Sequence, residues 1–278
     1  MKLSAQLFNM IWTGIIVFCL VLSVFSVVFT SCAKVEGGEE TADITDGDFI
    51  QREDEPEEID QEPVPTPKPP VRLQLTEDMG REYLDKLIFL GDSTTYGIGF
   101  YYNLGFEELC PPSQVWTPKS GTLTLAYYNV ATIVYPATEE EISIEEAVKR
   151  AKPEIMVLTV GVNGIAFMDE AWFKRDYASL VQMIHAASPD TKIILNSIYP
   201  VAASYPYQKD INNSKITDAN VWIEQIATDN DCRFLYSHEC VVGPDGYLPE
   251  TSQNGDGIHL TGEAYTTVMQ YIRTHAWQ

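Results

Sequence analysis

Three short segments, far apart in the sequence, carry side chains that can act on a carbonyl group. Ser93 stands in a Gly-Asp-Ser sequence, Asn163 stands in a Gly-Val-Asn-Gly sequence, and Asp256 precedes His259 by three residues. A serine hydroxyl becomes a good nucleophile when a neighbouring base takes its proton, and histidine suits that task near neutral pH. A carboxylate beside the histidine holds the ring in the required tautomer and stabilises the imidazolium. Asp256 and His259 can meet on one loop, without distant elements having to align.

The tetrahedral intermediate of such a reaction carries a negative oxygen that needs fixed hydrogen-bond donors. Each donor is typically worth ~10²–10³ in rate. The side-chain amide of Asn163 and the backbone N–H of Ser93 are the candidates that these segments offer. Together the residue types predict nucleophilic acyl chemistry.

Each residue also has a purely structural interpretation. Asp92 and Ser93 are of types preferred at helix N-termini, and an asparagine between glycines favours a tight turn. Asp256 and His259 could be hydrogen-bonded loop residues. The remaining histidines fit no such pattern, and we expect them to be structural or solvated: His185, His238 and His275.

The elements that would position these residues alternate between strands and helices. Apolar and β-branched runs predict strands at 86–90, 123–134, 154–160, 192–198 and 232–236. Amphipathic patterns predict helices near 143–151, 169–187, 216–229 and 261–274. Such alternation implies a parallel sheet with helices on both faces, in which ligands bind beyond the carboxyl ends of the strands. Ser93 and Asn163 each follow one of these predicted strands.

In order, spacing and position, the three segments resemble the first, third and fifth sequence blocks of the SGNH/GDSL hydrolases. The resemblance covers about residues 84–275. It implies an α/β fold, a flavodoxin-like three-layer sandwich with a central parallel sheet. It also implies that Ser93 is the nucleophile and that Asp256 and His259 complete the triad. Asn163 and the Ser93 N–H would then belong to the oxyanion hole.

Two features depart from the family pattern. Gly164 stands where the third block usually has an acidic residue, which affects the local loop rather than the triad. The second block, which supplies a glycine N–H to the oxyanion hole, has no clear motif here. Gly121, just before the 123–134 stretch, is our prediction for that donor, and Gly105 is the alternative.

Composition excludes several classes of protein. The 278 residues include 40 acidic and 18 basic side chains, for a formal net charge of −22. A chain this negative is unsuited to wrapping nucleic acid.

The sequence has no motif for a cofactor or a metal. No P-loop, G-x-G-x-x-G helix start, paired Cys-x-x-Cys or calcium loop occurs, so we expect no cofactor or metal. Beyond the N-terminal region three cysteines remain, Cys110, Cys232 and Cys240, and the sequence leaves open whether the last two form a disulfide.

The N-terminal region predicts a membrane anchor. Residues 11–30 are almost wholly apolar, and twenty helical residues span roughly 30 Å, the thickness of a bilayer core. The sequence ending in Cys32 resembles the lipobox of bacterial lipoproteins, with Phe29 in the place of the usual leucine. The alternative is an uncleaved signal anchor, because the apolar run exceeds the usual signal-peptide core. Either way, we expect residues 1–34 to tether the chain to the outer face of a bacterial cell membrane.

We expect residues 35–70 to form a disordered linker and residues 71–278 to form one hydrolase domain. Residues 36–70 hold thirteen acidic residues and end in a proline-rich tract, a composition that resists packing. Location and family resemblance predict an exported serine esterase acting on O-acyl, in particular O-acetyl, groups of cell-wall or other polysaccharide.

Two other functions fit the fold. One is acyl transfer to a sugar hydroxyl by the same triad, and the other is a non-catalytic glycan-binding or envelope-scaffold domain. The intact Ser/Asn/Asp/His set counts against the second of these. Several aromatic residues flank predicted loops and are candidates for stacking on sugar rings: Trp116, Tyr127, Tyr128, Tyr199, Tyr205 and Tyr207.

Overall fold

The structure is a computed structural model that describes residues 70–278. The predicted anchor, including Cys32, and nearly all of the predicted linker lie outside these residues. Within the described range, none of the helices combines the length and the apolar character needed to cross a membrane.

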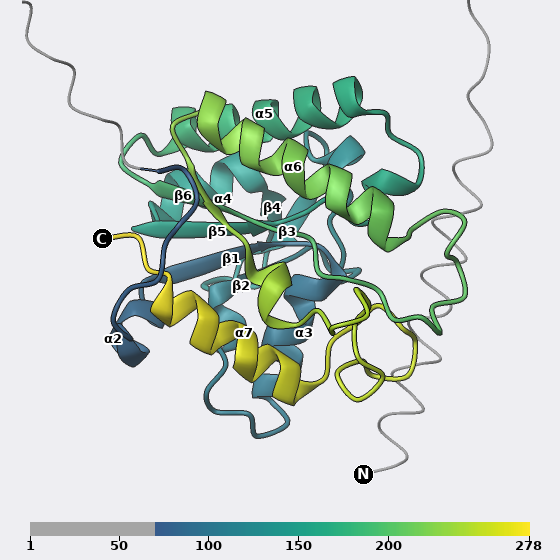
Figure 1. The fold of residues 1–278 in the computed structure, drawn as a ribbon. Helices are drawn as coiled ribbons and strands as arrows, with labels where there is room; N and C mark the ends of the chain where they lie inside the picture. The colour runs from purple at the N-terminus through teal and green to yellow at the C-terminus, as the bar shows by residue number, and fades with distance from the viewer. Residues whose placement is uncertain (1–69) are drawn as a thin grey trace, which may run out of the picture. The chain divides into compact units, whose positions relative to one another are not determined.

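Five parallel strands form the central sheet, in the order β2-β1-β5-β6-β7 (Figure 1). Their bounds are β1 Leu87–Gly91, β2 Val115–Trp116, β5 Ile155–Thr159, β6 Lys192–Asn196 and β7 Arg233–Leu235. Strand β1 pairs with β5 over its whole length, from Leu87 opposite Ile155 to Gly91 opposite Thr159. The carboxyl ends of these two central strands therefore lie side by side, and the residues that follow them share one rim of the sheet.

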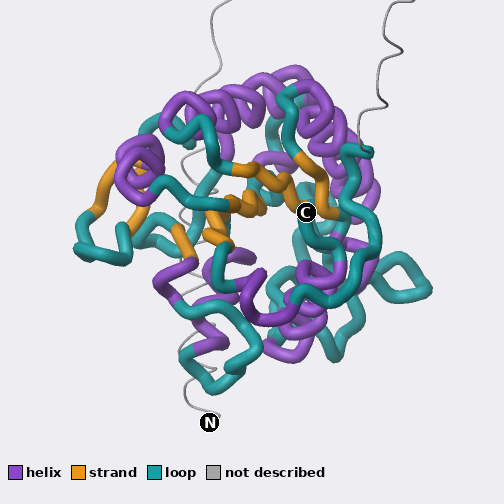
Figure 2. The backbone as a smooth tube through the Cα atoms, turned by 90° about the vertical axis from the view of Figure 1, so that its left-hand side faces the viewer, coloured by secondary structure: helices purple, strands orange, loops and turns teal. Residues whose placement is uncertain are grey.

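Helices cover both faces of the sheet, as Figures 1 and 2 show. The bounds are α2 Gly80–Leu84, α3 Ser93–Tyr102, α4 Ile144–Ala151, α5 Glu170–Ala187, α6 Asn213–Asp229 and α7 Gly262–Thr274. Side chains of α4, α5 and α6 share one buried cluster with Leu158 and Leu195 of the sheet. Side chains of α2, α3 and α7 share the other with Phe89 and Val157. The expected three-layer α/β sandwich is confirmed.

The predicted strand at 123–134 is wrong as a member of the central sheet. Strand β2, the edge strand, is only two residues long and lies upstream of it. The stretch instead holds a single 3-10 turn, η2 (Leu125–Tyr127), and strand β3 (Thr132–Val134), which pairs antiparallel with β4 (Glu141–Ser143). Its apolar side chains pack into the core without belonging to the central sheet. Leu123, Leu125 and Ile133 are all at most 1% exposed. Burial, and not strand pairing, explains the apolar pattern.

The beginning of the described chain pairs with the far edge of the sheet. The N–H of Leu73 donates to the Phe234 carbonyl at 2.8 Å, and the N–H of Phe234 donates to the Val71 carbonyl at 2.9 Å. Residues 71–73 therefore cover the open edge of β7. A bare strand edge is prone to pairing with other chains, so this cover also protects the sheet.

Candidate active site

Ser93 is the first residue of α3, directly after β1. Asp92 caps this helix, because its Oδ1 accepts hydrogen bonds from the Thr94 N–H at 3.0 Å and from the Thr94 hydroxyl at 2.7 Å. The helix-capping role considered for Asp92 is thus correct. The side chain of Ser93 does not cap the helix but contacts His259. The N–H of Ser93 lies in the first turn of the helix, where backbone donors lack intrahelical acceptors and the helix dipole is positive.

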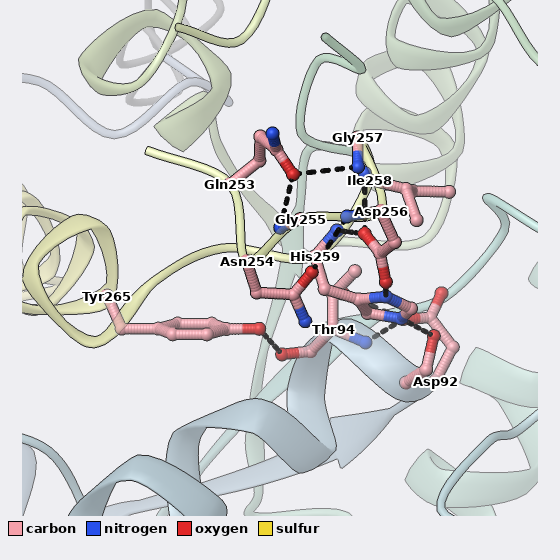
Figure 3. Close-up of polar contacts among 11 residues, drawn as sticks. Asp92, Thr94, Gln253, Asn254, Gly255, Asp256, Gly257, Ile258, His259 and Tyr265 are labelled. Carbon is pink, nitrogen blue, oxygen red and sulfur yellow. Dashed lines mark hydrogen bonds and ion pairs between the residues drawn. The ribbon is translucent and has the colours of Figure 1, made fainter. Parts of the chain in front are cut away.

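The three predicted triad residues form one hydrogen-bonded chain. The Nε2 atom of His259 lies 2.8 Å from Ser93 Oγ. Its Nδ1 atom lies 2.6 Å from Asp256 Oδ2, a contact that Figure 3 shows. An ionised carboxylate can only accept hydrogen bonds, so the proton of a neutral ring sits on Nδ1. Nε2 is then the acceptor for the Ser93 hydroxyl. The arrangement can remove the serine proton, which is the chemistry expected of it.

The Asp256 carboxylate is held from both of its oxygens. Oδ1 accepts from the N–H groups of Ile258 and His259, both at 2.9 Å, while Oδ2 faces the imidazole. Burial by itself raises the pKa of Asp256, but the hydrogen bond and charge of His259 and the two N–H groups lower it further, so the pKa lies below its ordinary value. Asp256 is therefore ionised at neutral pH and can stabilise an imidazolium.

The triad loop needs a glycine next to Asp256. Gly257 has a φ of 84°, and a Cβ there would lie 2.8 Å from the backbone of Tyr205. The carbonyl of Gly257 also accepts from the Ala202 N–H at 2.8 Å. A larger side chain would strain the turn and push this loop away from the segment that follows β6.

Asp92 connects the nucleophile segment to the segment of Asn163. Its carboxylate is 1% exposed, and it accepts a hydrogen bond from the N–H of Val162, the residue before Asn163. Burial raises the pKa of Asp92 to about 6, although the hydrogen bonds from Thr94 and Val162 and the charge of His259 oppose the rise. The buried Asp92 carboxylate therefore links the segments that follow β1 and β5. These segments carry Ser93 and Asn163.

Asn163 contacts the loop in which we predicted the second-block glycine. Its Nδ2 donates to the Thr122 hydroxyl at 3.2 Å, and the neighbouring Gly121 packs close to the ring of Tyr96, one turn beyond Ser93 on α3. The loop is therefore at the site. Sequence reasoning missed Thr122, and no motif in the sequence indicates it.

The predicted donor role of Gly121 does not fit this geometry. Its N–H donates to the Pro118 carbonyl at 2.7 Å, in a tight turn where the φ of Gly121 is 79°. That N–H is engaged inside the turn and is not directed to an oxyanion. The alternative, Gly105, lies in an exposed turn, and its N–H donates to Tyr102. The donors that remain from the prediction are the Ser93 N–H and the Asn163 amide.

The other histidines of the described range have local partners. His238 is buried, and its Nδ1 lies 3.0 Å from the Ile198 carbonyl; burial lowers its pKa. His275 stacks on Tyr271, and the Nε2 of His185 lies 3.8 Å from a cysteine sulfur. The thiols are free: Cys110, Cys232 and Cys240. No group of three or more potential metal-ligating side chains occurs between residues 70 and 278.

The six aromatic residues proposed for sugar stacking differ in exposure: Tyr127 is 57% exposed and Tyr128 is partly buried. Trp116, Tyr199 and Tyr205 are at most 6% exposed and belong to the core. Tyr207 is 37% exposed, and its ring packs at 5.8 Å against Tyr205, the residue that contacts the triad loop. Tyr96, which the sequence did not single out, is also 37% exposed.

A separate open hollow of about 320 Å³ is lined by η3 (Gly164–Ala166), α6 and the segment between η3 and α5. None of the triad residues lines this hollow.

Solved structures with similar folds come from several bacteria. A GDSL-like lipase from Bacteroides thetaiotaomicron is 23% identical, with 67% of this chain and 85% of that chain covered and a TM-score of 0.46. An acetylxylan esterase from Geobacillus stearothermophilus is 15% identical, with 66% and 90% covered and a TM-score of 0.44. The periplasmic domain of a Salmonella lipopolysaccharide acetyltransferase is 17% identical, with 67% and 82% covered and a TM-score of 0.43. No curated protein matches the chain.

The sequence pattern of the GDSL-like lipase/acylhydrolase family matches residues 89–267. The match begins within β1, ends within α7, and so includes every residue of the Ser93–His259–Asp256 chain. It spans well over half of the protein. This chain therefore belongs to the GDSL-like lipase/acylhydrolase family, and it is a serine esterase of the SGNH type.

Proposed function

We propose that Ser93 is the nucleophile of an ester hydrolysis, with His259 as general base and Asp256 as its orienting carboxylate. The observation that carries the proposal is the unbroken hydrogen-bonded chain from Ser93 Oγ through the imidazole to the Asp256 carboxylate. In the first step, Oγ forms a bond to the ester carbon while its proton moves to Nε2. The carbonyl oxygen becomes an oxyanion, which the N–H of Ser93 and the amide of Asn163 stabilise.

The intermediate then collapses to products. The carbon–oxygen bond to the leaving alcohol breaks, and the proton on Nε2 passes to that alcohol, leaving an acyl group on Ser93. A water molecule next gives a proton to Nε2 and attacks the acyl carbon. The second tetrahedral intermediate releases the carboxylic acid and returns the proton to Ser93 Oγ.

We further propose that the substrate is an O-acylated, in particular O-acetylated, polysaccharide outside a bacterial membrane. Support for the location comes from the apolar run at 11–30 and the acidic, proline-rich linker that follows it. Support for a sugar substrate comes from two tyrosines that are each 37% exposed, one on the helix of Ser93 and one beside Tyr205. Tyr96 lies one helical turn from Ser93, and Tyr207 packs beside the segment that contacts the triad loop. Tyrosine rings can stack on sugar faces while their hydroxyls bond to sugar oxygens.

The test compares a polymer with a small ester. Full-length, detergent-solubilised enzyme is incubated with acetylated xylan or O-acetylated peptidoglycan and, separately, with p-nitrophenyl acetate. Released acetate is measured, and acetylated acceptor sugars are sought by mass spectrometry. We expect acetate from the polymer, and we expect Tyr96→Ala and Tyr207→Ala each to reduce kcat/KM up to ~10-fold for the polymer and less for the small ester. Equal losses on both substrates would argue against a sugar-stacking role, and acylated acceptors in place of free acetate would indicate a transferase.

A further inference from the structure

The side chain of Gln253 holds the triad loop from within. Its carboxamide oxygen accepts hydrogen bonds from the Gly255 N–H at 2.5 Å and from the Gly257 N–H at 2.9 Å. Figure 3 shows both bonds converging on this one oxygen. The two glycines flank Asp256 on either side. Gln253 therefore holds the Asn254–Gly255 and Asp256–Gly257 peptide units, which lie on either side of the residue that faces His259.

A Gly-Asp-Gly loop is poorly able to hold its own shape. Both glycines have positive φ, 115° for Gly255 and 84° for Gly257, and glycine is the residue with the widest choice of backbone conformations. The two ends of the loop are joined at its base, where the Asn254 N–H donates to the His259 carbonyl and the Thr261 N–H donates to the Ser252 carbonyl, both at 2.9 Å. In the tip, the N–H of Asp256 donates to the Asn254 side chain at 3.2 Å, whereas the N–H groups of the two glycines depend on the side-chain oxygen of Gln253.

Gln253 is in turn held by a second segment of the rim. Its Nε2 donates to Glu250 at 2.9 Å, and the same carboxylate accepts from the Ser204 hydroxyl at 2.8 Å and from the Ser204 N–H at 3.3 Å. The oxygen of the Gln253 carboxamide thus accepts hydrogen bonds while its nitrogen donates one. Contacts at both atoms fix the orientation of the carboxamide. Glu250 connects the triad loop to the segment that follows β6.

We propose that Gln253 is a positioning residue for the esterase reaction. By holding the Asn254–Gly255 and Asp256–Gly257 peptide units on either side of Asp256, it sets the direction of the carboxylate toward His259 Nδ1, 2.6 Å away. This proposal rests on the proposed roles of Asp256 and His259 in catalysis. Catalytic groups must stay within ~0.5 Å of their productive positions, and a displacement of ~1 Å can lower the rate ~100-fold.

The test removes the acceptor and keeps the size of the side chain. Full-length Gln253→Met is compared with the wild type for hydrolysis of p-nitrophenyl acetate and for its rate of labelling by a fluorophosphonate. We expect kcat and the labelling rate to fall roughly 10- to 100-fold while KM changes less than about threefold. Gln182→Met is the matched control, because Gln182 makes its side-chain bond on α5, to Asn230. That control should behave as the wild type.

A reversed pair provides the rescue. In the double variant Gln253→Glu with Glu250→Gln, a carboxylate oxygen again accepts from both glycine N–H groups, and an amide at 250 can donate to it. We expect kcat within about fivefold of the wild type, well above that of Gln253→Met. A merely structural role predicts a lower melting temperature for Gln253→Met with a normal kcat, and that result would overturn the proposal.

Two further outcomes are decisive. If Gln253→Met does not fold, Glu250→Ala removes the outer contact without touching the loop N–H groups; we expect kcat to fall roughly 3- to 10-fold. A kcat within twofold of the wild type would then refute the positioning role. If the wild type itself neither hydrolyses the ester nor reacts with the fluorophosphonate, the proposed function fails first and this role fails with it. An active wild type with an unaffected Gln253→Met contradicts the positioning role alone.

Discussion

His259 Nε2 lies 2.8 Å from Ser93 Oγ although 166 positions separate the two residues in the sequence. Two elements bring them together. Ser93 begins α3 at the end of β1, and His259 precedes α7, which packs beside α3 on the same face of the sheet. Tyr265 of α7 is fully buried, and its hydroxyl donates to the carbonyl of Thr94 at 2.6 Å. This bond fixes one helix against the other next to the nucleophile.

Replacing Asn163 tests the oxyanion hole. An amide that donates to the oxyanion stabilises the transition state more than the bound ester, so Asn163→Ala should lower kcat by ~10²–10³, with a much smaller effect on KM. Steady-state kinetics with p-nitrophenyl acetate and a thermal melt measure both effects. If Asn163 only shapes its turn, kcat stays within a few-fold of the wild type and the melting temperature falls.

Thr122→Val serves as a companion variant. It keeps the shape of the side chain but removes the hydroxyl that contacts Asn163 Nδ2 at 3.2 Å. Loss of one such hydrogen bond should lower kcat less than Asn163→Ala does, by up to ~10-fold. Thr122→Ser retains the hydroxyl and should remain close to the wild type.

Much of the fold follows from the sequence because its central strands are buried on both faces. The predicted strands at 86–90, 154–160 and 192–198 match β1, β5 and β6 within about two residues at either end. Continuous apolar runs are typical of such strands. The edge strand β2 has only two paired residues, too few to leave a pattern, and no strand is predicted there. The β-rich stretch at 123–134 contributes only β3, which lies outside the central sheet.

The triad was accessible to sequence reasoning for a different reason. Ser93 is recognised by its residue type and its position after a strand, and Asp256 and His259 are recognised by their residue types and their spacing. The oxyanion donors depend on which way a backbone N–H points, and the turn that directs the Gly121 N–H to Pro118 has no sequence signature. Gln253 could not be predicted either, because its role depends on the folded shape of the loop around it.

The buried Asp92 should give the protein a specific pH dependence of stability. Its folded pKa of about 6 lies above its ordinary 3.8, so the folded state holds this proton more tightly than the unfolded chain does. The stability due to the protonated form is therefore present below about pH 4 and is lost as pH rises to about 6. The difference between the two pKa values corresponds to a loss of roughly 3 kcal/mol in the free energy of unfolding.

Urea unfolding at several pH values measures this effect against Asp92→Asn, which cannot titrate. Other carboxylates titrate in both proteins, so the informative quantity is the difference in unfolding free energy. The wild type should lose stability relative to the variant between about pH 4 and pH 6, and the difference should be constant above that range. A difference that does not vary with pH would mean that Asp92 has an ordinary pKa.

Truncation should locate the start of the folded domain. A fragment of residues 70–278 keeps the pairing of residues 71–73 with β7 and should unfold in one cooperative transition. A fragment of residues 76–278 loses two backbone hydrogen bonds and the burial of Leu73, so its unfolding free energy should be lower by at least about 2 kcal/mol. Equal stability of the two fragments would place the boundary further along the chain.

Lipid labelling of Cys32 distinguishes the two predicted kinds of anchor, a lipoprotein and an uncleaved signal anchor. If the lipobox resemblance holds, cells that express the protein with a fatty-acid analogue should label it, and Cys32→Ala should abolish the label. A signal anchor predicts an unlabelled membrane protein that keeps its N-terminus. Intact-mass analysis of the membrane fraction distinguishes a cleaved, lipidated chain from a full-length one, and a chain found in neither form would argue against membrane attachment.

The most direct test of the account is the reactivity of Ser93 itself. Full-length protein and Ser93→Ala are treated with a fluorophosphonate, digested and analysed by mass spectrometry, and both are assayed with p-nitrophenyl acetate. We expect the phosphonyl group on the peptide containing Ser93, no adduct in the variant, and loss of hydrolysis with an unchanged thermal melt. An adduct on another residue, or a folded Ser93→Ala that still hydrolyses the ester at close to the wild-type rate, would contradict the assignment of Ser93 as the nucleophile.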